Sequence, residues 1–176
     1  MMMYLGTLAY QANSDAVRFF LEKVYPAIKK QVNGVKFVLV SGYEPEWLGR
    51  YLTDASINYV KDSSSLAAEL FLRADVLVVP IRIASGTNIK ILEAMAAGLP
   101  VVTTSIGAEG LEVKNGENIL ISDQPSEIAK TVAGLLQDGS WREKIGRQAR
   151  KLVEKRYDWL KTTERLIPVY HELSDA

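Results

Sequence analysis

"ASGTNIKILEAMAAGLPVVTTS", residues 84–105, is the stretch that decides the fold. It reads as a polar loop with a glycine, then a helix, then a turn at Gly98-Leu99-Pro100 and a β-branched strand. Lys90 stands in the first turn of that helix, where the helix dipole disfavours a cation by about 0.3–1 kcal/mol. Two explanations stay open at this point. Lys90 either forms an ordinary surface ion pair with Glu93 or binds a negatively charged ligand at the loop.

The composition is that of one globular domain. Of the 176 residues, 48% are hydrophobic, which suffices for a real core and argues against disorder. Twenty-one basic residues balance twenty-one acidic ones, so the net charge gives no electrostatic case for binding nucleic acid. No run approaches the roughly 20 apolar residues that cross a bilayer, and we expect no transmembrane segment.

Cysteine and histidine usage excludes several kinds of active site. The chain has no cysteine, which rules out disulfides, thiolate metal sites and a cysteine nucleophile. Its one histidine, His171, lies near the end, so a Ser-His-Asp triad or a histidine metal cluster in the main body is excluded. We interpret His171 as a surface residue, and Trp141 and Trp159 as packing anchors at helix starts. No Asp-x-Asp motif occurs, and we expect no metal.

Short apolar strands alternate with helical patterns along the chain. A sheet of about six parallel strands, covered by helices on both faces, is the arrangement that such alternation predicts. Right-handed crossovers then give an α/β, doubly wound, Rossmann-like fold. The predicted strands are 2–8, 35–42, 57–60, 74–81, 100–105 and 118–122, and the predicted helices are 14–28 (capped by Asn13 or Ser14), 46–52, 63–71, 89–97, 126–137, 141–156 and 159–173.

Ligands of such folds bind where the parallel strands end. The loops at that edge are 6–14, 42–45, 60–65, 81–88 and 103–110. The first of them has Gly6 at the strand end but no G-x-G-x-x-G fingerprint, so dinucleotide binding of the NAD type is poorly supported. A simple strand-to-helix turn and a ligand-facing loop remain equally open for this segment.

The loop before Lys90 carries more chemistry. Ser85, Gly86, Thr87 and Asn88 supply two hydroxyls, an amide and a glycine that lets the backbone approach a ligand closely. The loop leads into a helix N-terminus, whose N–H groups can bind phosphate.

Helical spacing divides the following helix into two faces. We expect an apolar face made of Ile89, Leu92, Met95 and Ala96, and a second face that carries Lys90, Glu93, Ala94 and Ala97.

"PIRIASGTNIKILEAMAAGLPVVTTSIGAEGL" resembles the donor-binding half of GT-B glycosyltransferases, especially retaining enzymes of family 4 (glycosyl transferases group 1). Their shared pattern is a glutamate, seven residues, and then Glu-Ala-Met-Ala-x-Gly-x-Pro-Val-Val. The resemblance covers nearly the whole chain, since "YLGTLAYQANSDAVRFFLEKVYPAIK" resembles the start of that half and "SDQPSEIAKTVAGLLQDGSWREKIGRQARKLVEKRYDW" its end.

The resemblance implies roles for residues of the first and fourth loops. Glu93 matches the second glutamate of the pair, which binds the ribose hydroxyls of the nucleotide sugar, a task that suits a carboxylate. The first glutamate of the pattern falls at Ser85, so the carboxylate for the contact to the sugar ring is missing. Ser85 with the backbone of Gly86 and Thr87 is a candidate substitute, as in the similar Ser-Gly-Thr loop of glycogen phosphorylases.

Two basic residues that many relatives use to hold the diphosphate are missing. They fall near Thr7 and Ala12, and we expect Arg82 and Lys90 to take over the cationic role. Charge neutralisation by these two side chains and the helix N-terminus would replace a metal ion.

The resemblance places further segments around the same cleft. Gly107-Ala108-Glu109-Gly110 would border it, and Val60 and Lys61 would frame the base through backbone contacts. The candidate donor-binding residues are therefore Gly6, Thr7, Val60, Lys61, Arg82, Ser85, Gly86, Thr87, Asn88, Lys90 and Glu93, with Lys90 and Glu93 as the catalytic candidates.

Residues 1–176 are thus predicted to form a nucleotide-sugar-binding domain, one half of a GT-B glycosyltransferase (EC 2.4 type), with C-terminal helices at 141–174. The start "MMMYLG" enters a core strand abruptly, and we expect an acceptor-binding N-terminal domain outside this chain. Alone, the chain is expected to bind donor weakly and to transfer nothing measurable.

The expected partners are a nucleotide sugar and a glycan, lipid-linked or other acceptor. The expected location is cytoplasmic, with a peripheral association at the inner face of a membrane for the full-length enzyme. A non-catalytic nucleotide-sugar-binding or partner module is the alternative, supported by Ser85. A flavodoxin-like or receiver-like signalling domain is a weaker one, because Thr7 and Val60 do not supply the acidic cluster that it needs.

Overall fold

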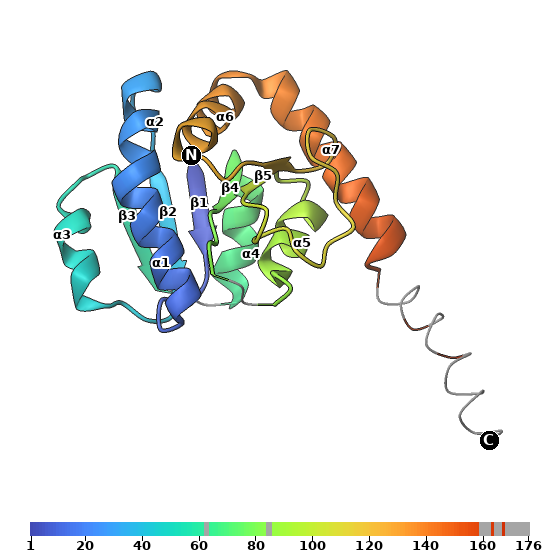
Figure 1. The fold of residues 1–176 in the computed structure, drawn as a ribbon, viewed down its shortest axis with the longest axis horizontal. Coiled ribbons are helices and arrows are strands. Elements are labelled where there is room, and N and C mark those ends of the chain that lie inside the picture. Colours follow the sequence, from blue (N-terminus) through green and yellow to red (C-terminus); the bar gives the residue numbers. More distant parts are fainter. Residues whose placement is uncertain (62–63, 84–85, 159–162, 164–166, 168–176) are drawn as a thin grey trace.

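The computed structural model describes residues 1–61, 64–83, 86–158, 163 and 167. Six strands and the helices between them form the predicted α/β fold (Figure 1). The strands are β1 (Met2–Leu5), β2 (Phe37–Ser41), β3 (Ile57–Lys61), β4 (Val76–Val79), β5 (Val101–Thr103) and β6 (Leu120–Ile121). The helices are α1 (Gln11–Phe19), α2 (Tyr25–Gln31), α3 (Gly49–Leu52), α4 (Ser64–Arg73), α5 (Ile89–Ala96), α6 (Pro125–Gln137) and α7 (Gly139–Arg156). A π-helical turn, Phe20–Val24, joins α1 to α2, and a 3₁₀ turn, Glu46–Leu48, precedes α3.

The sheet has the strand order β3-β2-β1-β4-β5-β6, and each of its strand pairs is parallel. This is the doubly wound order in which the chain reverses direction between β1 and β4. Strands β2, β4 and β5 are buried along their whole length, which explains their unbroken apolar sequences. The reversal between β1 and β4 places the loops after these two strands side by side at the carboxyl edge.

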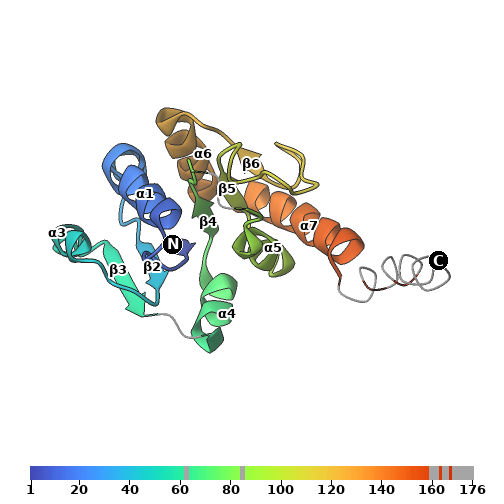
Figure 2. The ribbon, with the colours of Figure 1, turned by 60° about the horizontal axis from the view of Figure 1, so that its bottom comes forward.

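Helices cover both faces of the sheet. Figure 2 shows α1 and α6 on one side of the strands and α4 and α5 on the other. Helix α6 packs against α2 and against β4 and β5, while α5 packs on β4 and β5 and against α7. None of the helices within the described ranges is long and apolar enough to cross a membrane.

The turn after β1 lies three residues earlier than the predicted strand and helix suggested. Strand β1 ends at Leu5 rather than residue 8, because Gly6 adopts a φ of 153°, which breaks the strand. Helix α1 follows with Tyr10 as its N-cap, so the predicted cap at Asn13 or Ser14 is wrong. Asn13 lies instead inside the first turn of α1, with its side chain turned towards β1.

Helix α5 ends in a Schellman motif. The N–H of Leu99 donates to the carbonyl of Ala94 (2.9 Å), and the N–H of Gly98 donates to that of Met95 (3.0 Å). Gly98 has a φ of 73°, which fits the left-handed position of this motif. The backbone of Gly146 in α7 lies directly against this turn, since a Cβ on Gly146 would stand 2.0 Å from the Gly98 carbonyl oxygen.

The predicted faces of α5 need a correction. The residues that enter the core are Ile91, Ala94 and Met95, whereas Ile89 is 65% exposed. The apolar stripe starts two positions later than expected, because Ile89 lies on the side that faces the loops rather than the sheet. Lys90 therefore sits beside the buried stripe and can reach β1.

The C-terminal part of the prediction is confirmed for α6 and α7. The ring of Trp141 packs so closely on Gly134 that a Cβ there would lie 2.8 Å from it, as expected of a packing anchor. Trp159, His171 and the predicted helix 159–173 fall outside the residues that the structure describes, apart from 163 and 167.

Candidate functional site

The beginnings of α1 and α5 enclose a hollow of about 520 Å³ at the carboxyl edge of the sheet. The two helices follow β1 and β4, the neighbouring strands between which the sheet reverses direction. The lining residues are Tyr10, Gln11, Ala12, Asn13, Ile83, Thr87, Asn88, Ile89 and Lys90. Two loops that the sequence singled out thus meet in one place, as a doubly wound fold requires.

Both helices reach this hollow without a side-chain cap. Tyr10, the N-cap of α1, forms no side-chain bond to the helix N–H groups. Asn88, the N-cap of α5, is buried and donates its side-chain N–H to the Gly107 carbonyl instead (3.0 Å). Neither helix has an acidic residue in its first turn. Two positive helix ends therefore face one hollow, an arrangement that favours an anion.

The Lys90 ammonium lies between these two helix ends. Its Nζ donates to Asn13 Oδ1 (2.9 Å) and to the Tyr4 hydroxyl (3.4 Å), and it stands 4.9 Å from the centre of the Tyr4 ring. Among the described residues, no carboxylate approaches this ammonium within 4 Å. The surface pair with Glu93 is thus not formed, and Lys90 points inward.

Burial alters the acidity of Lys90. Desolvation lowers the pKa of its ammonium from 10.5 to about 8, and the negative charge of Glu93 opposes this in part. Lys90 is accordingly a cation at neutral pH that has lost much of its hydration and has gained only neutral partners. Such a group gains strongly from an incoming anion.

Gly6 makes room for the ammonium. A Cβ on Gly6 would lie 2.6 Å from Lys90 Nζ and 3.0 Å from Asn13 Nδ2. The glycine at the end of β1 and the lysine of α5, distant in sequence, are therefore in contact. Thr7 is half-buried, and its carbonyl accepts a bond from Asn13 Nδ2 (2.9 Å).

Arg82 has a carboxylate partner, unlike Lys90. Its Nε and Nη2 donate to the two oxygens of Asp15 in α1 (3.0 and 2.6 Å), and its guanidinium lies 4.3 Å from the centre of the Phe19 ring. A phosphate would have to compete with Asp15 for this side chain. Within the predicted cationic pair, Lys90 is the one that is poised for a ligand.

The other predicted residues fall around or away from the hollow. Glu93 is exposed one turn beyond Lys90, and Gly86 is exposed with a φ of 77°. Thr87 lines the hollow and comes close to Gly110, where a Cβ would lie 3.3 Å from its Oγ1. Ser85 lies outside the described residues.

Val60 and Lys61 end the edge strand β3, separated from β1 by β2. They do not line this hollow and sit further along the same sheet edge.

The prediction from sequence missed Tyr4 and Asn13. Asn13 precedes the buried Ala16 and Val17 by three and four residues, which places it on the inward face of α1. A polar side chain on an apolar helix face was the available signal. Tyr4 offered none, because an aromatic residue in a buried strand is ordinary core.

The fold and the hollow together define a Rossmann-like domain with a hollow at its switch point that two helix N-termini and a lysine face. Within that class the chain belongs to the glycosyl transferases group 1 family, whose model matches residues 1–138. An uncharacterized glycosyltransferase of Methanocaldococcus jannaschii is 28% identical over 177 residues, covering 97% of this chain and 44% of that protein. The chain thus spans less than half of this relative.

Solved structures share the fold. Sucrose-phosphate synthase from Thermosynechococcus elongatus superposes with a TM-score of 0.81 at 20% identity, over 99% of this chain and 45% of that one. HepE from Anabaena in complex with UDP-glucose gives 0.78 at 15% identity, over 97% and 48%. The C-terminal domain of a glycosyl transferase group 1 protein from Francisella tularensis gives 0.69 at 20% identity, over 90% and 86%. The fold is therefore that of the C-terminal half of GT-B enzymes.

Proposed function

We propose that this domain binds the nucleotide-diphospho-sugar donor of a glycosyltransferase, with the diphosphate in the hollow between α1 and α5. The observation that carries the proposal is the meeting of two uncapped helix N-termini with the Lys90 ammonium, which has no carboxylate partner among the described residues. A diphosphate carries the negative charge and the acceptor oxygens that would pair with this cation and with the free helix N–H groups. The UDP-glucose complex of HepE, a protein of the same fold, supports this reading.

Lys90 has a second role in this proposal. When the glycosidic bond breaks, negative charge grows on the leaving diphosphate. A cation and helix N–H groups already in position stabilise that charge without rearranging during the reaction. Retention of configuration is implied by the family resemblance alone.

The remaining candidates surround the diphosphate. Glu93, exposed one turn beyond Lys90, would accept bonds from the ribose hydroxyls. Gly6 and Thr7 would border the phosphates from β1, and Gly86 and Thr87 would do so from the loop before α5. Ser85 and Asn88 complete that loop in the proposal, although the Asn88 amide already binds Gly107.

The base would lie further along the sheet edge. Val60 and Lys61 end β3, two strands from β1, and would frame the base through their backbone. Arg82 would add positive charge once it leaves Asp15. No metal ion is needed in this arrangement, because the cations and helix ends supply the positive charge.

Large exposed apolar side chains around the hollow suit a two-domain enzyme. Tyr10, Tyr43, Ile83, Ile89 and Ile106 are exposed and belong to loops or helix starts at this edge. Apolar residues gathered at one edge are typical of a surface that contacts another body. We assign that body to an acceptor-binding domain, so this chain alone would bind donor weakly and transfer nothing measurable.

Calorimetric titration of the chain with UDP-, GDP- and ADP-sugars tests the proposal. Lys90→Ala is expected to weaken binding of the preferred nucleotide about 100-fold, and Glu93→Gln about tenfold. Lys130→Ala and Glu127→Gln are matched controls, because both residues are exposed on α6. Binding that is unchanged in Lys90→Ala would contradict the proposed diphosphate site.

A non-catalytic nucleotide-sugar-binding module is the second candidate. Ser85 favours it, because the resemblance leads one to expect a glutamate there. A transfer assay on the full-length protein separates the two. Donor binding without transfer to any acceptor supports the module, and turnover that is lost in Lys90→Ala supports the enzyme.

A further inference from the structure

We propose that Asn13 is a positioning residue, whose side-chain oxygen holds the Lys90 ammonium at the donor phosphates without neutralising its charge. The inference rests on the proposed function, and it adds a residue to which the resemblance assigns no role. Its basis is a closed set of hydrogen bonds that joins α1, β1 and α5.

The Asn13 amide has a single workable orientation. Its Nδ2 donates to the Thr7 carbonyl (2.9 Å), which turns its Oδ1 towards Lys90 and Tyr4. That oxygen accepts from Lys90 Nζ at 2.9 Å and from the Tyr4 hydroxyl at 2.7 Å. Both ends of the amide are therefore used, and a flipped amide would set an N–H group against the ammonium.

Tyr4 completes the arrangement from the sheet. It is fully buried in β1, and burial raises the pKa of its hydroxyl well above the ordinary value, so the group stays neutral. Its proton goes to Asn13, and its oxygen faces Lys90 at 3.4 Å. The ring beneath the ammonium adds a cation–π contact at 4.9 Å.

The neutrality of Asn13 matters for the ligand. An aspartate in this place would form an ion pair with Lys90 and cancel the charge meant for the diphosphate. Its second oxygen would also face the Thr7 carbonyl, where the amide now donates. An alanine would leave the ammonium and the Tyr4 hydroxyl without their acceptor. An amide both fixes the cation and leaves its charge available.

Within the part of the chain that the structure describes, the titratable and charged groups around Lys90 come from β1, α1, α5 and the loop after β4. Tyr4 faces it from β1, and Glu93 lies one turn along α5. Arg82, in the loop after β4, and Asp15, on α1, bind each other. A change in the titration of Lys90 on substitution of Asn13 can therefore be assigned to the lost or altered contact.

The test is the titration of Lys90 itself, followed by NMR in the chain labelled with ¹³Cε-lysine, with Lys90→Arg to assign the signal. Asn13→Ala is expected to make Lys90 titrate at a lower pH than in the unchanged chain, because a hydrogen bond to the charged form is lost. Asn13→Asp is expected to make it titrate at a higher pH. Identical titration in all three chains overturns the proposal.

Donor binding provides the second readout. At pH 7, Asn13→Asp is expected to weaken UDP binding about 10-fold to 100-fold, although Lys90 is then fully charged. Equally tight binding in Asn13→Asp and the unchanged chain would overturn the claim that neutrality matters. If the unchanged chain binds no UDP, UDP-sugar or other nucleotide sugar while the Lys90 titration still moves, the donor proposal fails and the hold of Asn13 on Lys90 stands.

Folding is controlled separately. Asn33→Ala replaces an exposed asparagine after α2 and should change neither readout. Tyr4→Phe keeps the ring beneath Lys90 and removes only the hydroxyl, so it should lower the pH at which Lys90 titrates by less than Asn13→Ala does. Amide spectra that match the unchanged chain show that each variant is folded before it is titrated.

Discussion

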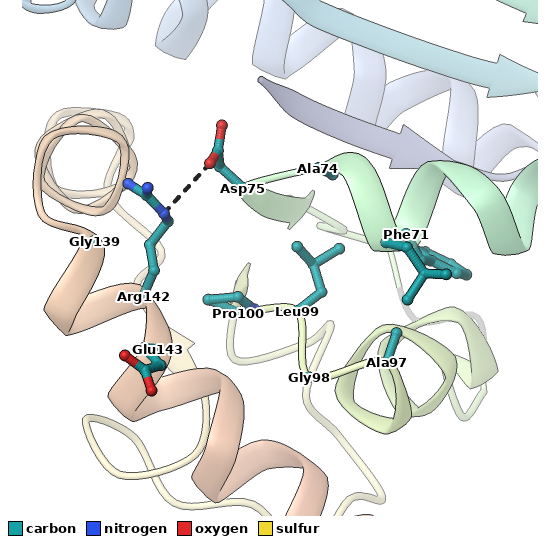
Figure 3. Close-up of a pocket in the computed structure, with 11 residues that line it drawn as sticks. Phe71, Ala74, Asp75, Ala97, Gly98, Leu99, Pro100, Gly139, Arg142 and Glu143 are labelled. Carbon is teal, nitrogen blue, oxygen red and sulfur yellow. Dashed lines mark ion pairs between the residues drawn. The ribbon is translucent and has the colours of Figure 1, made fainter.

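Two hollows at opposite edges of the sheet each contain one long basic side chain, and they differ in what surrounds it. At the carboxyl edge, Lys90 has an amide and a phenol as partners. At the amino edge, a hollow of about 260 Å³ contains Arg142 from α7 (Figure 3). Its Nε lies 3.4 Å from Asp75, and its Nη1 donates to the carbonyls of Leu135 (2.5 Å) and Leu136 (3.2 Å) at the end of α6.

The difference separates a cation that is used within the fold from the one that we propose binds the donor. Arg142 pairs with a carboxylate and donates to two helix carbonyls, so partners within the fold compensate its charge. Lys90 is desolvated and held by neutral groups beside two positive helix ends, so its charge is unfavourable until an anion arrives. The charge balance around the two cations, rather than the size of the hollows, is therefore the reason to place the proposed donor site at the carboxyl edge.

Replacement of Lys90 is expected to have the largest effect and to act in opposite directions on binding and stability. Lys90→Met should abolish measurable nucleotide binding, a loss of about 100-fold or more. It should also raise the free energy of unfolding by about 1–2 kcal/mol, because a desolvated cation is removed.

The stability gain in Lys90→Met depends on pH with a definite sign. The pKa of Lys90 is lower in the folded chain, about 8, than in the unfolded chain, about 10.4. The unfolded state therefore binds more protons between these values, and the unchanged chain becomes more stable as pH rises through them. The gain should be largest below pH 8 and should shrink as the pH rises towards 10.5. Urea unfolding at pH 7 and pH 10 checks this, and a loss of stability at pH 7 would contradict it.

Arg142→Met should show the reverse of this behaviour. It removes the ion pair with Asp75, which keeps only its contact to the Met1 ammonium, and the hydrogen bonds to the two α6 carbonyls. The free energy of unfolding should fall by about 1–3 kcal/mol. Nucleotide affinity should change by less than about twofold, because Arg142 lies at the amino edge of the sheet, away from the proposed donor site. Thermal unfolding and calorimetry measure the two effects. A large loss of affinity in a folded Arg142→Met chain would break the distinction between the two edges.

The pH dependence of binding sharpens the same contrast. UDP affinity should fall about tenfold between pH 7 and pH 9, because Lys90 loses its proton around pH 8. The terminal phosphate of UDP has already lost its second proton in this pH range, so its own titration contributes little to the change in affinity. Calorimetry in buffers of different ionisation heats should show proton uptake on binding above pH 8. Affinity that stays constant to pH 9 would mean that Lys90 does not bind the diphosphate.

Of the substitutions at the carboxyl edge, Arg82→Ala is expected to weaken nucleotide binding the least. Arg82 must leave Asp15 before it can meet a phosphate, so its loss should weaken binding only about twofold to fivefold. The double variant Arg82→Ala with Asp15→Ala tests whether the pairing with Asp15 limits the contribution of Arg82. Removal of both partners should weaken UDP binding no more than removal of the arginine alone. A loss as large as that of Lys90→Met would place Arg82 with Lys90 as a principal ligand.

The sequence predicted the sheet and the fold class because both depend on repeating patterns. Alternation of apolar strands with helices predicts a parallel sheet, and right-handed crossovers cover both of its faces with helices. The strand order itself comes from the structure. The conspicuous position of Lys90 could also be recognised, since it contradicts the helix dipole.

The neighbours of Lys90 could not be predicted in the same way. They come from β1 and α1, and the contact depends on the φ of Gly6 and on where α1 begins. The predicted start of α1 was three residues too late, so Asn13 was interpreted as a cap rather than as part of the helix. The predicted apolar stripe of α5 began two residues too early, so Ile89 was expected in the core. Helix ends and faces are decided by tertiary contacts, which a single sequence does not show.

The backbone contact between Gly98 and Gly146 has a mechanical consequence. Where two helices meet through side chains, rotamer changes absorb small shifts, but here a carbonyl oxygen meets a glycine and nothing between them can yield. A change in the spacing of α5 and α7 at this point would require their backbones to move. Figure 1 shows α7 extending beyond the sheet. The position of α7 is therefore set directly against the end of α5, the helix whose first turn carries Lys90.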